Sequence, residues 1–154
     1  MHHRKGFERP PAWTDRFRSP TPADLRESLR APVRPLYDIL RKRLQINPNV
    51  REEIVWYGDC WHWSLEYRTV LSKEPLAVLI PAPHDLQLAL PMDQEFTRSL
   101  PMQRLKRAVR DGLDLVQEPY QSRWGIWSVG AATIIDDLQD LIELKLAHLT
   151  KAAG

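Results

Sequence analysis

The stretch Trp56-Tyr57-Gly58-Asp59-Cys60-Trp61-His62-Trp63-Ser64-Leu65-Glu66-Tyr67-Arg68 decides the fold class. Aromatic and aliphatic residues flank Gly58-Asp59, which is the pattern of a β-hairpin closed by a two-residue turn. Gly58 provides the positive φ that the first central position of such a turn requires. The register that follows pairs Tyr57 with Cys60, Trp56 with Trp61, Val55 with His62 and Ile54 with Trp63.

The two faces of this hairpin differ in chemistry, because successive side chains of a strand point to opposite sides. One face is predicted to be apolar and to comprise Ile54, Trp56, Trp61, Trp63, Leu65 and Tyr67. The other face is mixed and comprises Glu53, Val55, Tyr57, Cys60, His62, Ser64, Glu66 and Arg68. An apolar face opposite a mixed one is typical of an antiparallel sheet with helices packed on one side.

The rest of the chain predicts helices around this hairpin and three further strands. Thr21-Pro22 has the residues of a helix start, an N-cap hydroxyl followed by proline at the first helical position. A second helix begins near Pro35, and later helices are expected at 93–99, from Pro101 and at 131–149. Strands are expected at 76–80, 84–90 and 123–129. The predicted fold is α+β: an antiparallel sheet of about five strands, a four-strand meander plus a late strand at an edge or between earlier strands, with helices mainly on one face.

Length and composition indicate one soluble domain. The 154 residues divide into an extended Arg/Pro-rich N-terminal arm at 1–20 and a single α+β domain at 21–150. The single cysteine excludes an internal disulfide and favours a reducing, cytoplasmic location. No apolar run approaches the ~20 residues of a membrane span, so no membrane contact is expected. The polar, Arg-rich start of the chain lacks the apolar centre of a secretory signal.

Charge is distributed unevenly along the chain. Residues 1–51 contain 12 Lys/Arg against 5 Asp/Glu, whereas residues 52–154 contain 10 against 15. The basic arm, together with a predicted helix face of Arg104, Lys106, Arg107 and Arg110, fits association with a nucleic-acid backbone. The alternative is that these charges are ordinary solvated surface.

Two segments, 53–68 and 123–145, resemble the bacterial "domain of unknown function 3788" family. The resemblance covers roughly residues 21–150, and it rests on the tryptophan-rich hairpin and on a tryptophan strand followed by an Asp/Leu-rich helix. It implies a small α+β domain whose fold is similar to that of the frataxin-like iron-handling proteins. Fold similarity does not assign a function, so a small enzyme or an iron-handling protein is one alternative among several.

The mixed face of the hairpin is the candidate ligand-binding site. It places Tyr57, His62, Glu66 and Arg68 on one surface, and Trp127 of the late strand is predicted to join them as an exposed ring. His62 can exchange a proton near neutral pH, and Glu66 and Arg68 can hold a polar ligand. The expected function is that of a bacterial binding domain for a small molecule or a protein partner; the alternative is a solvated sheet face.

Other chemistry has less support in the sequence. HxxxH, CxxC and HExxH spacings are absent, as are the glycine-rich phosphate-binding motifs, so no metal and no cofactor is expected. Cys60 and His62 can form a nucleophilic pair, but no third residue that would orient them is evident. No catalytic residue is therefore assigned. A hydrophobic edge strand would also support a homodimer.

Overall fold

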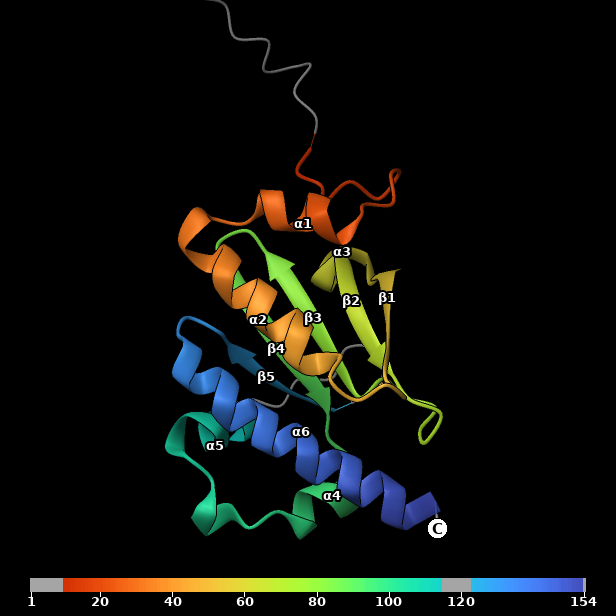
Figure 1. Ribbon diagram of the computed structural model, residues 1–154, viewed down its shortest axis with the longest axis vertical. Helices are drawn as coiled ribbons and strands as arrows, with labels where there is room; N and C mark the ends of the chain where they lie inside the picture. Colours follow the sequence, from red (N-terminus) through yellow and green to blue (C-terminus); the bar gives the residue numbers. More distant parts are fainter. Residues whose placement is uncertain (1–9, 115–122, 154) are drawn as a thin grey trace, which may run out of the picture.

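The computed structural model describes residues 10–114 and 123–153. Five strands form one antiparallel sheet in chain order: β1 (Arg51–Trp56), β2 (Trp63–Arg68), β3 (Ala77–Ala82), β4 (Asp85–Pro91) and β5 (Trp124–Ser128) (Figure 1). This arrangement confirms the predicted α+β class. The late strand joins the meander at its edge, beside β4.

Helices cover one face of the sheet, with α2 and α6 crossing in front of it in Figure 1. The longer helices are α1 (Pro22–Ser28), α2 (Arg34–Leu44), α5 (Arg107–Asp114) and α6 (Ala132–Ala153). The shorter ones are η2 (Ala31–Val33), α3 (Gly58–Trp61), α4 (Gln94–Ser99) and η3 (Met102–Arg104). α1 starts as predicted, because the Thr21 hydroxyl accepts from the Asp24 N–H and the Asp24 carboxylate accepts from the Thr21 N–H. No helix of the described residues could cross a bilayer.

The helix predicted to start at Pro101 begins instead at Arg107. The intervening chain forms η3 and then becomes extended at Leu105, whose side chain packs against the core. Arg104 therefore does not share a helix with Arg107 and Arg110, although all three side chains are exposed. The single basic helix face expected from the sequence is thus divided between two elements.

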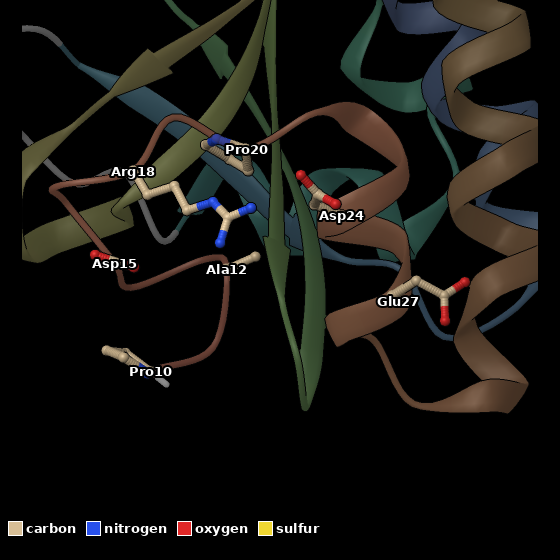
Figure 2. A pocket seen from close by; sticks show the side chains of 7 residues that line it. All are labelled: Pro10, Ala12, Asp15, Arg18, Pro20, Asp24 and Glu27. Carbon is tan, nitrogen blue, oxygen red and sulfur yellow. The ribbon is translucent and has the colours of Figure 1, made fainter. Parts of the chain in front are cut away.

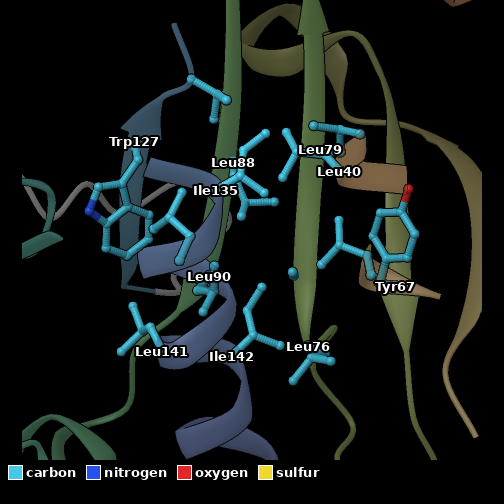
Figure 3. Packing of buried hydrophobic residues seen from close by; sticks show 14 of the residues in the cluster. Leu40, Tyr67, Leu76, Leu79, Leu88, Leu90, Trp127, Ile135, Leu141 and Ile142 are labelled. Atoms are coloured by element: carbon cyan, nitrogen blue, oxygen red, sulfur yellow. The ribbon is translucent and has the colours of Figure 1, made fainter. Parts of the chain in front are cut away.

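Each face of the sheet carries its own apolar cluster. The larger lies between the sheet and the helices and includes Leu40, Leu65, Leu79, Leu88, Trp127 and Leu138 (Figure 3). The smaller lies on the opposite face and consists of Tyr57, Trp61, Val78, Ile80, Ala89 and Trp124. The alternation predicted for 84–90 is confirmed, since Leu86, Leu88 and Leu90 belong to the larger cluster and Ala89 to the smaller.

The connection between β1 and β2 is longer than the predicted two-residue turn. Residues Gly58–Trp61 form one helical turn, and the Tyr57 N–H donates to the His62 carbonyl oxygen at 2.7 Å. The observed register pairs Ile54 with Leu65, Val55 with Ser64 and Trp56 with Trp63. The predicted turn and register are therefore wrong, although Gly58 does have the expected positive φ, at 73°. Because the register shift equals two residues, the strand side chains keep their predicted faces.

Trp61 is the tryptophan whose position differs most from the prediction. It belongs to the helical turn rather than to β2, and its indole packs edge-on against Trp124, with ring centroids 4.9 Å apart. This contact lies on the face opposite the helices, whereas the hairpin pattern predicts the helix side. Trp63 does pack with the helix-side core, and Trp56 contacts it edge-on, with ring centroids 5.3 Å apart.

The described part of the arm, residues 10–20, packs on the end of the hairpin. The Trp63 backbone N–H donates to the Trp13 carbonyl oxygen at 3.1 Å, and the Trp63 indole donates to the Asp15 carbonyl oxygen at 2.7 Å. Of the two aromatic side chains in this segment, Trp13 packs against the body and Phe17 is almost fully exposed. The arm is thus attached to the sheet through one tryptophan and two hydrogen bonds.

Candidate functional site

A hydrogen-bonded network of Tyr57, Glu66 and Arg68 lies on the sheet face opposite the helices. Glu66 is only 5% exposed, and its two carboxylate oxygens accept from the Tyr57 hydroxyl and from Arg68 Nε, the latter at 2.6 Å. The hydrogen bond to Glu66 raises the pKa of Arg68, so the guanidinium stays charged. A buried carboxylate requires such partners, because burial removes its hydration.

The local sequence explains why these side chains meet. Glu66 and Arg68 are two residues apart on β2 and therefore point to the same face. Tyr57 directly follows β1, the strand that pairs with β2. Arg68 is held further by a hydrogen bond from Nη1 to the Lys73 carbonyl oxygen at 2.9 Å. Three of the five predicted site residues are thus brought together.

The network forms one side of a shallow hollow of about 290 Å³. The residues that line it are Val55, Trp56, Tyr57, Glu66, Arg68, Pro75 and Trp124. Apolar walls with a few fixed polar groups are the usual composition of a small-molecule site. The Arg68 side chain is 35% exposed, and no described residue accepts a hydrogen bond from its Nη2. One guanidinium donor is therefore available to a ligand.

His62 is placed differently from the prediction. Its ring lies against Trp13 and Trp56, with centroid separations of 4.3 and 5.6 Å, because the longer loop turns it toward the arm. His62 Nδ1 and Trp13 Nε1 are both buried, and neither has a hydrogen-bond partner among the described residues. The His62 backbone has φ 51° and ψ −136°, a region that side chains with a Cβ disfavour.

Trp127 also differs from its predicted placement. It is buried under the helices, beside Ile135 in Figure 3, and its indole donates to the Val109 carbonyl oxygen at 2.9 Å. The prediction that Trp124 and Trp127 point to opposite faces of β5 is confirmed, but Trp124 is the one that lines the hollow. Strand alternation predicts that Trp124 and Trp127 point to opposite faces, but it does not decide which of the two faces the helices.

Two further charged groups lie on the helix side of the sheet, the half-buried Arg41–Glu52 pair and the buried Lys145. Arg41 of α2 forms a two-pronged ion pair with Glu52 of β1, with N–O distances of 2.7 and 3.0 Å, and the Tyr67 hydroxyl donates to the same carboxylate at 2.6 Å. Lys145 of α6 donates to the carbonyl oxygens of Leu76 and Pro91 at 3.1 and 2.8 Å. Arg41 thus joins α2 to β1, and Lys145 joins α6 to the ends of two strands, so both side chains have structural roles.

Metal and thiol chemistry finds no support in the described part of the chain. Residues 10–114 and 123–153 contain no group of three or more His, Cys, Asp or Glu side chains that could hold a metal ion. Desolvation raises the pKa of the Cys60 thiol, whereas a nucleophilic cysteine requires a lowered pKa. The basic side chains at 104–110 are solvent-exposed, and nucleic-acid association through them stays a prediction.

A second hollow, which is polar and has a volume of about 280 Å³, lies between the arm and α1 (Figure 2). Its charged lining consists of Asp15, Arg18, Asp24 and Glu27. The Asp24 carboxylate caps α1, and the Asp15 carboxylate accepts from the Phe17 N–H at 3.2 Å. These two groups therefore have local structural partners.

Comparison of the chain with family models, with curated proteins and with solved structures gives no match. The resemblance described from the sequence thus stays an expectation, and the case for function depends on the geometry of the site.

Proposed function

We propose that the protein is a binding domain for a small, flat, mainly apolar molecule that carries a carbonyl group. The ligand would lie in the hollow beside the Tyr57–Glu66–Arg68 network, with its ring against Trp124 and Pro75. The observation that carries the proposal is a fully compensated buried carboxylate at the wall of an apolar hollow.

The charges around the hollow favour an uncharged acceptor. Arg68 offers Nη2 as a donor, but its positive charge is already balanced by Glu66. Glu53 and Arg51 lie opposite Glu66 and Arg68 in the β1–β2 register and both are exposed, so the charges on this face of the strand pair cancel. A carboxylate ligand would find no unbalanced positive charge there, whereas a carbonyl oxygen would accept from Arg68 without needing one.

Stability alone does not explain the network. Replacing a buried ion pair by apolar residues of similar size is often neutral or stabilising. A buried carboxylate paired with a partly exposed arginine, next to an aromatic wall, is better suited to orienting a ligand. The role of Glu66 would be to fix Arg68 in position before the ligand arrives, which reduces the entropy that binding costs.

A fragment screen by ligand-observed NMR tests the proposal, with flat bicyclic carbonyl compounds such as 2-quinolone and matched hydrocarbons without the carbonyl. We expect the carbonyl compounds to bind wild-type protein and Arg68→Ala to weaken them about tenfold, the effect of losing one hydrogen bond from a charged donor. Arg98→Ala on α4 is the control, since Arg98 is also an exposed arginine. Equal binding to the Arg68→Ala variant, or equal binding of the hydrocarbons, would contradict the proposal.

A further inference from the structure

Helices α2 and α6 leave an apolar seam between them. An open hollow of about 440 Å³ lies between the end of α2, the loop at 46–50 and α6. A small void of about 20 Å³ lies further along the seam, where Leu40, Ile135 and Leu138 line it. The hollow and the void share Arg43, Leu44, Gln139 and Ile142 as lining residues. They are therefore neighbouring parts of one apolar space.

Arg43 lies at the junction of the two parts, since it lines both. It reaches from α2 to α6, where Nη1 donates to Asp136 Oδ1 at 2.9 Å and to Gln139 Oε1. The Arg43 and Asp136 side chains are 37% and 64% exposed, and ion pairs exposed to this degree contribute little to stability. Arg43 can therefore leave this position at small cost, which would join the hollow to the void.

The wall of the hollow is mainly aliphatic. Its apolar members are Leu44, Ile46, Pro48, Val50, Leu76, Ile142 and Leu146. Ile46 stands at the rim with 62% of its surface exposed, so an occupant that covered it would remove apolar area from water. The hydrogen bond that Lys145 donates to the Leu76 carbonyl oxygen holds the backbone at Leu76 in place. The wall is thus largely preformed for an apolar occupant.

The polar groups at the rim select the head group of that occupant. Arg43 and Asp136 neutralise each other, and Glu143 adds a further negative charge, so an anionic head group is disfavoured. Gln139 and Asn47 contribute uncharged amides to the same rim. When Arg43 moves away, Gln139 Oε1 loses its donor and can accept a hydrogen bond from the occupant instead.

We infer that the α2–α6 seam binds an elongated, uncharged amphiphile, with its hydrocarbon chain in the hollow and its hydroxyl or amide head group at Gln139. The volume of 440 Å³ lies in the range of small-molecule sites. A second copy of the chain inserting Ile46 would fill only part of that space. This site is separate from the hollow at Arg68 and does not depend on the function proposed for it.

Fluorescence of the uncharged probe N-phenyl-1-naphthylamine, displaced by 1-hexanol or 1-dodecanol, tests the inference. Leu146→Trp should fill the hollow and weaken probe binding at least tenfold, whereas Leu144→Trp, on α6 but outside the lining, should leave it unchanged. Arg68→Ala should also leave it unchanged, because that residue belongs to the other hollow. Equal binding to the Leu146→Trp variant and wild type would overturn the inference, as would loss of binding in the Arg68→Ala variant.

Arg43→Ala provides a test that damage to the fold cannot imitate. Since it frees Gln139 Oε1 and opens the seam, it should strengthen the displacement of the probe several-fold by 1-dodecanol and by a smaller factor by 1-hexanol. An equal effect on both alcohols, or weaker binding of both, would overturn the role assigned to Arg43. Light scattering that showed a dimer dissociated by Ile46→Ser would assign the seam to a second copy and would likewise overturn the inference.

Discussion

The indole of Trp127 occupies the space that a side chain at Gly112 would need: a Cβ at position 112 would lie 2.0 Å from Trp127 Nε1. The indole is fixed there by its hydrogen bond to the Val109 carbonyl oxygen. Gly112 thus lets α5 pack closely on β5, the edge strand that also carries Trp124.

Gly112→Ala is therefore expected to destabilise the protein, although alanine normally favours a helix by up to about 1 kcal/mol relative to glycine. Overpacking against the fixed indole should outweigh that gain, with a net loss of about 1–3 kcal/mol in the free energy of unfolding. Gly130→Ala is the matched control, because a Cβ there meets no atom within 4 Å. Its effect should stay within about 0.5 kcal/mol. Urea unfolding of both variants makes the measurement, and a Gly112→Ala protein as stable as wild type would refute this packing account.

The stability of the protein should rise between pH 7 and pH 9 because of Lys145. Burial lowers the pKa of this amine to about 7, so in that range the folded protein has released a proton that the unfolded chain, whose lysine has an ordinary pKa, still holds. Stability increases with pH wherever the unfolded state binds more protons.

Lys145→Met isolates this contribution. The stability of wild type relative to the variant should increase with pH, by at most about 1.4 kcal/mol per pH unit. Urea unfolding of both proteins at several pH values between 6.5 and 9 provides the comparison. A difference that is flat or falls with pH would mean that Lys145 is not desolvated in the fold.

At position 62, glycine should give a more stable protein than alanine, which is the reverse of the usual order of stability. Both substitutions remove the ring contacts with Trp13 and Trp56, so they differ mainly in backbone strain at φ 51°. His62→Gly should be more stable than His62→Ala by about 1 kcal/mol or more. At Cys60, inside the helical turn, alanine should be the more stable of the same two substitutions. The same order at both positions in thermal unfolding would argue against the positive φ.

Tyr57→Phe should cost stability through Glu66. The substitution removes one of the two side-chain hydrogen bonds that Glu66 accepts. Leaving a buried acceptor without one of its hydrogen bonds costs about 1–3 kcal/mol. In a Glu66→Gln background the same substitution should cost less, because no buried charge remains. Urea unfolding of the four proteins in this double-mutant cycle gives the coupling energy. A coupling indistinguishable from zero would show that the two side chains act independently.

The sequence allowed the fold class to be predicted, but the turn geometry predicted from it was wrong. The alternation of Leu86, Leu88 and Leu90 fixed the helix-facing side of β4, because a period of two is determined by the backbone alone. The turn prediction failed because a Gly-Asp pair fits both a two-residue turn and the start of a helical turn. The helical turn lets Trp61 pack on Trp124, and that contact joins residues far apart in the chain.

The candidate site was predictable in the part that strand alternation controls. Glu66 and Arg68 share a face of β2 for that reason, and Tyr57 joins them from the adjacent strand end. His62 was misplaced because the loop extends beyond the strand, where alternation no longer applies. The α2–α6 seam had no signature in the sequence, since it depends on how far apart two helices pack.

The most direct test of the account follows the indole N–H signals of Trp124 and Trp127 by two-dimensional NMR, while a carbonyl compound selected in the fragment screen is added. Binding in the proposed hollow predicts that the Trp124 signal shifts in a saturable way, that the Trp127 signal stays in place, and that Arg68→Ala moves the midpoint of the titration to about tenfold higher ligand concentration. Saturable binding with no change at Trp124, or with the larger change at Trp127, would contradict the central claim.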